Sequence, residues 1–286
     1  MRAKWMSLSL ICGLAAGAAA AQTTPATADT SAMYCSGVVT SDAVPQDRYL
    51  ISGEESYDKT TFVLHDLVYV NRGSEQGVKE GDEFLVVRPE SEHLQQEWFR
   101  HQNSLMHAMG TTYSDRGRIR IVHVGPKVST AEIVFACSYL QRGDLVLPFA
   151  ERPAPTLRPA SLDYFAPPSG KTAMIVSTKG FGEAVAHDEI VYVNMGSEQG
   201  VQVGSYLRVF RYQGDSKEYV YNVKGLAYRA YGFGSTPVSY TGADLPRDVV
   251  GEGIVLRVTK NTATVMIVAT RRSSIFAGDY VELESR

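Results

Sequence analysis

Short runs of apolar, β-branched and aromatic residues recur along the chain and are separated by turn-forming residues. Leu67–Val70 and Phe84–Val87 are such runs, and Asn, Gly and Asp stand at their ends. Between Arg118 and Val124, apolar residues alternate with charged ones, as in a strand with one buried face. β-Branched and aromatic residues favour strands, while Gly and Asp favour turns. The pattern predicts a mainly all-β protein built from small barrels or sandwiches.

A long stretch of this pattern occurs twice. Residues 67–89, LVYVNRGSEQGVKEGDEFLVVRP, return as residues 190–212, IVYVNMGSEQGVQVGSYLRVFRY, at an offset of 123 residues. A weaker repeat follows each copy, beginning at Gly117 and at Gly251, with a Gly-Asp step before its last apolar run. We therefore predict two tandem β-domains that arose by internal duplication.

Most of the residues that the two copies share are turn formers. Glycine reaches backbone conformations with positive φ at little cost, and Asn tolerates them. We therefore interpret the shared residues as a structural framework rather than as a catalytic or metal site. The framework residues are Asn71, Gly73, Gly77 and Gly81 in the first copy and Asn194, Gly196, Gly200 and Gly204 in the second.

The pattern VYVN-x-GSEQGV-x-x-G, followed later by a Gly-Asp strand, resembles a β-repeat of bacterial envelope proteins. It is similar to the C-terminal domain of the flagellar assembly protein T and to modules found beside LysM domains in exported proteins. Acidobacterial exported proteins of unassigned function are similar across most of the mature chain, including a connector like YFAPPSGK. The resemblance implies a non-catalytic role in the cell envelope.

The rest of the chain divides around the two copies. We expect the first β-domain over 34–147 and the second over 171–286, joined by a connector over 148–170 that holds half of the twelve prolines. Proline fixes φ and removes a ladder donor, so the connector is predicted to be extended and semi-stiff.

Each domain carries its own insertion between its two halves. The first insertion covers about 90–113, and its apolar residues Leu94, Trp98, Leu105 and Met109 fall on one face at helical spacing. A short helix is therefore predicted within the first domain. The second insertion covers about 213–250 and is rich in Tyr and Gly, with no helical period. A recurring framework with divergent insertions favours function in the loops.

The N-terminus has the pattern of a cleaved signal peptide over 1–21. Arg2 and Lys4 precede a short apolar core, and Ala19–Ala21 offers a small-residue cleavage site before Gln22. No other segment approaches the roughly 20 apolar residues of a membrane helix, so no integral membrane segment is expected after cleavage. Residues 22–33 are low in apolar content and are predicted to be a disordered leader. We expect an exported protein, periplasmic or extracellular.

Removal of the signal peptide leaves two cysteines, Cys35 and Cys137. In an oxidising compartment two thiols in one chain favour a disulfide, and two buried free thiols are the alternative. The formal net charge is −3, with no run of Lys or Arg. Nucleic-acid affinity depends largely on clustered positive charge, so no nucleic-acid partner is expected.

His93, Glu97 and His101 are spaced four residues apart and would share one side of a helix. Two histidines and a carboxylate can bind zinc and leave a position open for water. The spacing is not His-Glu-x-x-His, and the second domain has no counterpart, so a solvated helix flank is the alternative. No Gly-x-Ser-x-Gly elbow is present. We expect neither an enzyme nor a cofactor; a secreted hydrolase would need a carboxylate pair or a metal in one cleft.

Aromatic residues gather in the second insertion, interleaved with glycines. Tyrosine combines a large apolar face with a polar tip, which suits glycan stacking or a protein interface. The alternative is that these side chains only pack against a hairpin or a barrel edge. The candidate binding surface consists of Tyr219, Tyr221, Tyr228, Tyr231, Phe233 and Tyr240.

Taken with the resemblance, these features favour an interaction or structural protein that docks to another envelope protein. A module that binds peptidoglycan or another glycan through the tyrosines of the second insertion is the alternative.

Overall fold

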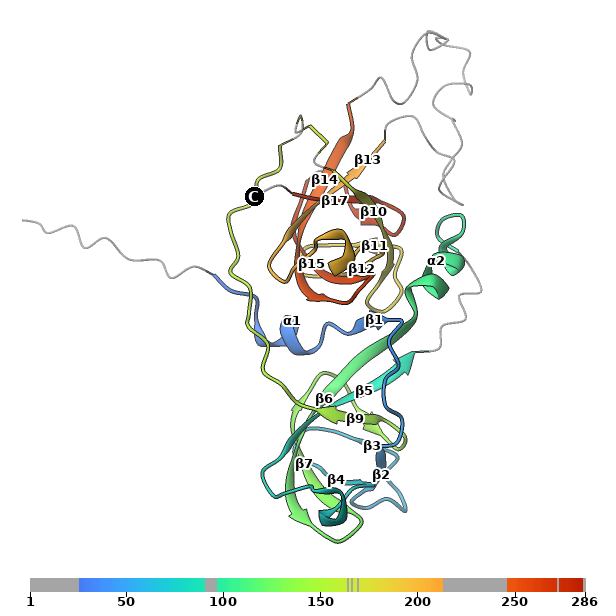
Figure 1. Ribbon diagram of the computed structural model, residues 1–286, viewed down its shortest axis with the longest axis vertical. Helices are drawn as coiled ribbons and strands as arrows, with labels where there is room; N and C mark the ends of the chain where they lie inside the picture. The colour runs from blue at the N-terminus through green and yellow to red at the C-terminus, as the bar shows by residue number, and fades with distance from the viewer. Residues whose placement is uncertain are drawn as a thin grey trace, which may run out of the picture.

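A computed structural model describes residues 26–90, 97–163, 165, 167–168, 170–212, 246–271 and 273–284. Two β-bodies lie one above the other along the long axis, and helix α1 lies between them (Figure 1). Within the described residues the α-helices are α1 (Thr30–Tyr34) and α2 (Gln102–Met109), and the 3₁₀ turns are η1 (Ser74–Gln76) and η2 (Ser197–Gln199). The prediction of an all-β fold with barrels is confirmed.

The first body, here called the first barrel, is a curled antiparallel sheet in the order β2-β4-β7-β6-β5-β9. Its two edges meet because Leu50 N donates to Asp144 O at 2.9 Å and Val146 N donates to Arg48 O at 3.0 Å. The strands are β2 (Leu50–Gly53), β4 (Leu67–Val70), β5 (Glu83–Glu90), β6 (Thr111–Val124), β7 (Ser129–Ala136) and β9 (Leu145–Pro148). β1 (Val38–Thr40) pairs with β6, and β3 (Thr61–Phe62) with β8 (Leu140–Gln141).

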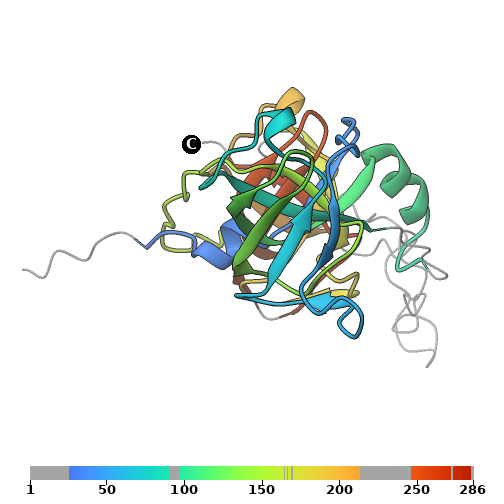
Figure 2. The same ribbon diagram turned by 90° about the horizontal axis from the view of Figure 1, so that it is seen from below.

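The second body, the second barrel, is a closed barrel in the order β10-β12-β15-β14-β13-β17. Figure 2, seen from below, shows the strands of the first barrel in front of it. The strands are β10 (Thr172–Thr178), β12 (Ile190–Val193), β13 (Tyr206–Arg211), β14 (Asp248–Val258), β15 (Ala263–Thr270) and β17 (Tyr280–Leu283). β11 (Ala184–Val185) pairs with β16 (Ile275–Phe276). This short strand pair is the counterpart in the second half of the chain of the β3–β8 pair in the first half.

The strand register matches the duplication seen in the sequence. Val86 pairs with Gly117 in the first barrel, and Val209 pairs with Gly251 in the second. In both pairs of strands the register shifts at the next residue. The weaker half of the repeat therefore aligns through Gly117 and Gly251 as its spacing suggests.

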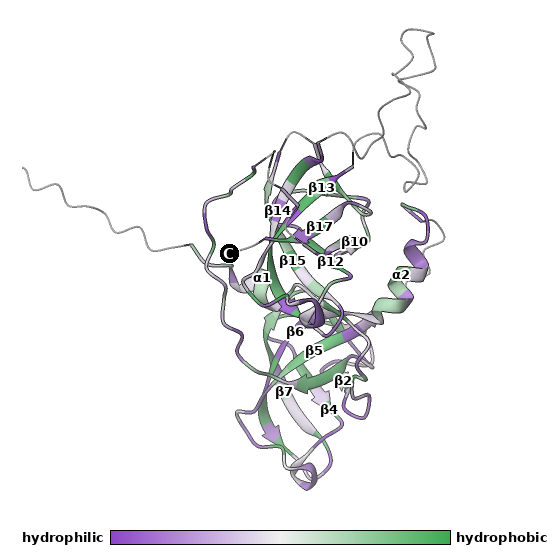
Figure 3. Cartoon of the chain, turned by 45° about the horizontal axis from the view of Figure 1, so that its top comes forward, coloured by the Kyte–Doolittle hydropathy of each residue, from purple (hydrophilic) through white to green (hydrophobic). Residues whose placement is uncertain are grey.

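The two barrels differ in what covers their outer faces. Strand β4 alternates between buried and half-buried residues, whereas all four residues of β12 are buried. A separate apolar cluster contains Phe99, Met109 and Met33 from the first half of the chain and Tyr192, Ile254 and Met266 from the second barrel. Apolar residues, green in Figure 3, follow the strands, and polar residues gather at the turns of the lower end. The outer face of the second barrel is thus an inter-barrel core.

The helix in the first insertion is shorter than predicted. β5 continues to Glu90, β6 begins at Thr111, and α2 covers only Gln102–Met109. His101 is the N-cap with φ 70°, a left-handed conformation that no helical residue adopts. Leu105 and Met109 lie on the helix, Trp98 precedes it, and Leu94 is outside the described residues. The backbone turns at His101 because Phe99 is buried against the second barrel.

The prediction of a disordered leader is wrong for its described part, residues 26–33. Thr27 pairs with Thr156 of the connector, and α1 begins at Thr30, where the Asp29 side chain accepts a hydrogen bond from Ala32 N. Met33 is only 2% exposed. Low apolar content misled the prediction because two buried side chains, Ala28 and Met33, are enough to fix the segment against a barrel face, although most of its other residues are exposed.

Candidate functional site

The framework asparagines close the strands that precede them. Asn71 Oδ1 accepts a hydrogen bond from Tyr49 N at 2.8 Å, and Asn194 Oδ1 accepts one from Met174 N at 2.7 Å. Each Asn stands directly after its strand, β4 or β12, and bonds to the neighbouring strand, at the residue before β2 or at the third residue of β10. In both copies the Asn side chain therefore accepts a hydrogen bond from a backbone amide and has a structural role.

The GSEQGV motif forms a 3₁₀ turn that packs on the next hairpin. Gln76 Oε1 accepts from Gly73 N at 2.8 Å, and Gln199 Oε1 accepts from Gly196 N at 2.7 Å. A Cβ atom on the glycine that opens either turn would collide with backbone carbonyl oxygens of the β6–β7 or β14–β15 hairpin. The later framework glycines have positive φ values: 80° at Gly77, 88° at Gly81, 92° at Gly200 and 81° at Gly204. The framework residues are therefore structural in both copies.

An arginine and an aspartate recur as a buried ion pair in each barrel. Arg88 Nε donates to Asp144 at 2.6 Å, and Arg211 Nε donates to Asp279 at 2.5 Å. Asp144 and Asp279 belong to the Gly-Asp steps, and both are fully or almost fully buried. Burial acts to lower the pKa of Arg88, but its hydrogen bonds to Asp144 hold that pKa above its ordinary value. The pair ties the end of β5 or β13 to the turn before the last strand.

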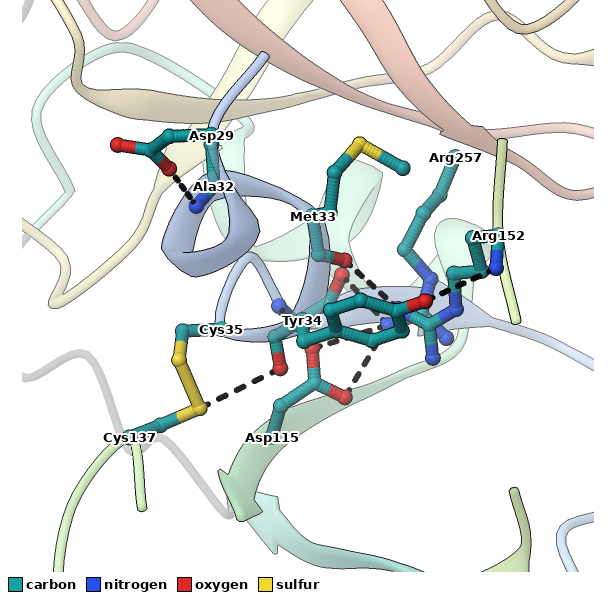
Figure 4. The surroundings of a disulfide bond; sticks show 10 residues. Asp29, Ala32, Met33, Tyr34, Cys35, Asp115, Cys137, Arg152 and Arg257 are labelled. Atoms are coloured by element: carbon teal, nitrogen blue, oxygen red, sulfur yellow. Dashed lines mark hydrogen bonds and ion pairs between the residues drawn. A yellow bond between two sulfur atoms is a disulfide. The ribbon is translucent and has the colours of Figure 1, made fainter. Parts of the chain in front are cut away.

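The contacts between the barrels converge on Asp115, a fully buried carboxylate of β6. Asp115 accepts hydrogen bonds from Gly37 N at 2.8 Å and from Arg257 Nη1 at 3.1 Å. Arg257 Nη1 also donates to Gly37 O at 3.1 Å. Figure 4 shows Asp115 between the disulfide and Arg257, with Arg152 beside them. One carboxylate of the first barrel thus holds an arginine of the second barrel and the segment before β1.

Tyr192 of β12 completes this contact. Its hydroxyl donates to Ser36 O at 2.9 Å. Burial raises the pKa of Tyr192, and the negative charge of Asp115 raises it further. Gly37 has φ 69°, and a Cβ there would lie 2.6 Å from the Tyr192 hydroxyl oxygen. Only glycine allows this close approach.

The insertion of the first domain reaches across to the second barrel. Trp98 Nε1 donates to Phe181 O at 3.2 Å, and Gln102 Nε2 donates to Val176 O at 2.8 Å. Phe99 is fully buried between these contacts. The insertion therefore positions the barrels relative to each other.

The connector is fastened both to the N-terminal segment and to the second barrel. Ala28 N donates to Pro155 O at 3.1 Å, and Leu157 N donates to Ala26 O at 2.7 Å. Arg158 forms ion pairs with Glu252 and Glu284. In Figure 1 the connector runs along one side of the molecule from the first barrel to the second. The prediction of an extended connector is compatible with these contacts, but the segment is held and is not a free spacer.

Cys35 and Cys137 form a disulfide, with an S–S distance of 2.03 Å. The bond joins the segment after α1 to the segment after β7 (Figure 4). The disulfide inferred from the sequence is present, and the alternative of two free thiols is wrong. The bond fastens the N-terminal segment to the first barrel, while the rest of that segment packs on the second.

A cleft of about 590 Å³ opens beside the disulfide and has walls from both barrels. We call it the inter-barrel cleft. Arg116 of the first barrel pairs with Glu90 at 3.1 Å within its wall. Lys179 and Phe181 come from the turn that follows β10. A smaller cleft of about 260 Å³ shares Cys35 and Lys179 with the inter-barrel cleft. The cleft walls include Arg88, Glu90, Asp115, Arg116, Lys179 and Tyr192.

The proposed zinc ligands are not on one helix. Glu97 and His101 precede α2, and His93 lies outside the described residues. Glu97 accepts a hydrogen bond from Asn103 N at 3.0 Å and so caps the start of the helix. The helical spacing on which the zinc hypothesis depended is therefore wrong for Glu97 and His101. Within the described ranges, no group of three His, Cys, Asp or Glu side chains is arranged to hold a metal ion.

The aromatic surface predicted in the second insertion lies outside the described residues. This applies to the whole candidate set, Tyr219, Tyr221, Tyr228, Tyr231, Phe233 and Tyr240.

Sequence reasoning missed Asp115, Arg257 and Lys179. A signal for the inter-barrel core was nevertheless present in the comparison of the two copies. Ile254 replaces Arg120, and Met266 replaces Glu132, at positions that pair equivalently in the two barrels. Apolar residues on both faces of a strand indicate burial on both sides.

No protein-family model matches the chain, and no curated protein matches it. In the part of the chain that the structure describes, neither helix is long and apolar enough to cross a bilayer.

Proposed function

We propose that this chain is an exported, non-catalytic protein of the cell envelope that docks to another envelope protein. The signal-like residues 1–21 support export, as does a disulfide that oxidising compartments favour. The resemblance of the VYVN-x-GSEQGV repeat to envelope modules supports the envelope role. The residues that recur between the copies serve turns and strand closure, which fits a scaffold.

The observation that carries the proposal is the inter-barrel cleft. Its walls come from both barrels, and the Asp115–Arg257 pair and the disulfide stand beside it. A cleft between two mutually fastened bodies is preformed, so a partner does not have to order it on binding. Preorganisation of this kind lowers the free-energy cost of association.

Site-specific photo-crosslinking in the native envelope tests docking at the cleft. A benzoylphenylalanine at Ser138, on the cleft wall, is compared with one at Lys127, an exposed residue of the β6–β7 hairpin. We expect one discrete crosslinked product from the Ser138 position that the Lys127 position does not give. Identical products from both positions, or none from either, would contradict docking at the cleft.

A glycan partner is the competing proposal, and the Tyr and Gly composition of residues 213–250 supports it. Aromatic faces stack on sugars, and such contacts are insensitive to salt. Co-sedimentation of residues 22–286 with purified peptidoglycan sacculi separates the two proposals. Saturable pelleting at high salt that is lost in Tyr228→Ala or Tyr231→Ala would favour the glycan over the protein partner.

A further inference from the structure

We propose that the inter-barrel cleft binds a carboxylate side chain of an acidic peptide segment, with Lys179 of the second barrel as its main cation. The inference rests on the proposed function, because it names the chemistry of the docking partner. The cleft, at about 590 Å³, lies within the size range of ligand sites in proteins. It has room for one or a few side chains of a partner and not for a folded element.

The charge of the cleft has the opposite sign to that of the chain. The sequence carries a formal net charge of −3, whereas three cations and two carboxylates line the cleft. Arg88 is paired with Asp144, and Arg116 with Glu90. Asp115 is paired with Arg257. Lys179 lines the cleft without a carboxylate within 4.0 Å among the described residues.

Arg152 is a second positive charge near Asp115 of the cleft wall. Arg152 Nη1 donates to Met33 O at 2.9 Å and contacts the Tyr34 ring face, 5.4 Å from its centroid. Burial lowers the pKa of Arg152, and the charge of Arg257 lowers it further, while Asp115 raises it. Asp115 is paired with Arg257, and Arg152 lies close enough to both for its pKa to respond to their charges. An anion in the neighbouring cleft would relieve the excess positive charge.

The paired arginines favour a carboxylate over a phosphate. Phosphate groups are commonly held by the two-pronged donors of free arginines. Both arginines that line the cleft already donate to carboxylates of this chain, Asp144 and Glu90. A single lysine offers one compact charge, which matches one carboxylate.

The cleft is not suited to adding a strand. β9 pairs with β5 only as far as Val87, so among the described residues Arg88–Glu90 pair with β6 on one side alone and lie on the cleft wall. Pro89 has no backbone N–H to donate at this edge. Recognition must therefore come from side chains, and Phe181 and Tyr192 provide apolar wall for the carbon atoms of an acidic side chain.

Fluorescence anisotropy of a labelled Gly-Glu-Glu-Gly peptide with the mature protein tests the inference, and the Gly-Gln-Gln-Gly peptide serves as the neutral probe. We expect binding of the acidic peptide only, weakened by salt, because exposed charges are screened. Lys179→Glu should weaken binding by about tenfold or more, because it replaces attraction with repulsion. Lys127→Glu is the matched control, since it makes the same charge change on the distant β6–β7 hairpin, and it should bind as the wild type does.

Equal binding of both peptides, or an unchanged affinity in Lys179→Glu, would overturn the inference. Preferential binding of a phosphorylated peptide would overturn the choice of a carboxylate. The crosslink at Ser138 separates this failure from failure of the proposed function. If the acidic peptide does not bind but the Ser138 position gives a discrete crosslink, the docking proposal stands and the carboxylate inference is wrong. If neither is observed, both are wrong.

Discussion

At the scale of single residues, a few buried polar groups determine how the two barrels meet. Asp115 is the centre of this contact, because its fully buried side chain accepts hydrogen bonds from Gly37 N and from Arg257 Nη1. A buried carboxylate that loses its charge leaves its cationic partner uncompensated. The exposed pair between Asp47 and Arg72 on the first barrel has no such dependence, because water solvates both groups.

We expect Asp115→Asn to lower the free energy of unfolding by about 3 kcal/mol, because Arg257 and Arg152 then face no buried carboxylate. Urea unfolding followed by tryptophan fluorescence measures the change. Asp47→Asn is the matched control and should change the free energy by no more than about 1 kcal/mol. Similar losses in both variants would show that Asp115 has no special part in the contact.

The raised pKa of Tyr192 predicts that the protein loses stability at alkaline pH. Its pKa is raised above the ordinary value of 10.0, so the unfolded chain loses this proton first as the pH rises. The stability that neutral Tyr192 contributes is complete below pH 10 and is lost above it, at up to about 1.4 kcal/mol per pH unit. Tyr192→Phe should therefore lose less stability between about pH 8 and about pH 10.5 than the wild type.

Urea unfolding at the two pH values measures this difference. Tyr69→Phe is the matched control, because it removes one hydroxyl from the equivalent, half-buried position of the first barrel. The explanation fails if wild type and Tyr192→Phe lose the same stability over this interval.

At the scale of elements, the 3₁₀ turns and the connector join strands that are distant in sequence. Ser74 N donates to Gly125 O, and Ser197 N donates to Thr259 O, both at 2.9 Å. Each turn therefore fastens the end of β4 or β12 to the hairpin between β6 and β7 or between β14 and β15. The same geometry in both copies explains why GSEQGV survived the duplication while the insertions diverged.

We expect Gly196→Ala to destabilise the protein by about 2 kcal/mol, because its Cβ would collide with the carbonyl oxygens of Thr259 and Lys260. Thermal unfolding by circular dichroism measures the loss. Gly182→Ala is the control, since its Cβ would make only ordinary contacts, the nearest at 3.7 Å. An unchanged melting temperature in Gly196→Ala would contradict the close packing of the turn.

We expect Arg158→Gln to loosen the connector from the second barrel, because its ion pairs with Glu252 and Glu284 are lost. The amides of Leu157 and Ala28 form the hydrogen bonds between the connector and the N-terminal segment. Hydrogen exchange at both amides should accelerate. Arg142→Gln, which removes a hydrogen bond to Ser56 O on the first barrel, should leave both amides unchanged. Equal protection in the two variants would show that Arg158 does not hold the connector.

At the scale of the whole molecule, the first half of the chain forms part of the surroundings of the second barrel. α1, β1 and the residues around α2 cover the barrel face that contains Tyr192, Ile254 and Met266. The disulfide links cysteines 102 residues apart, and the loop that it closes contains β1 to β7 of the first barrel but not β9. The two barrels are therefore mutually dependent, and the cleft depends on both.

We expect the double variant Cys35→Ser/Cys137→Ser to lose about 2 to 4 kcal/mol of unfolding free energy, because the unfolded chain is no longer constrained by the long loop. Denaturant unfolding measures the loss. The wild type should also change mobility on a gel when reductant is added, and the variant should not. Equal stability of the two proteins would show that the bond does not constrain the fold.

The repeat and its strands could be predicted from the sequence because they depend on local chemistry. Period-two alternation between Arg118 and Val124 and the turn residues of GSEQGV need only neighbouring residues to be interpreted. The pairing of Cys35 with Cys137 followed from the small number of cysteines and the expected compartment. The short helix predicted in the first insertion is present as α2, but it begins only after His101, and Trp98 and Phe99 before it pack against the second barrel.

The sequence by itself determined the β class, the duplication, the turn framework and the two cysteines available for a disulfide, since each is encoded within short stretches of chain. Only the tertiary structure decided that the N-terminal segment and the first insertion cover the second barrel. It alone brought Asp115 to Arg257, 142 residues apart, and placed Lys179 on a cleft with Arg116. Such contacts depend on the packing of whole barrels, and no local pattern of residues specifies which buried charge will meet which.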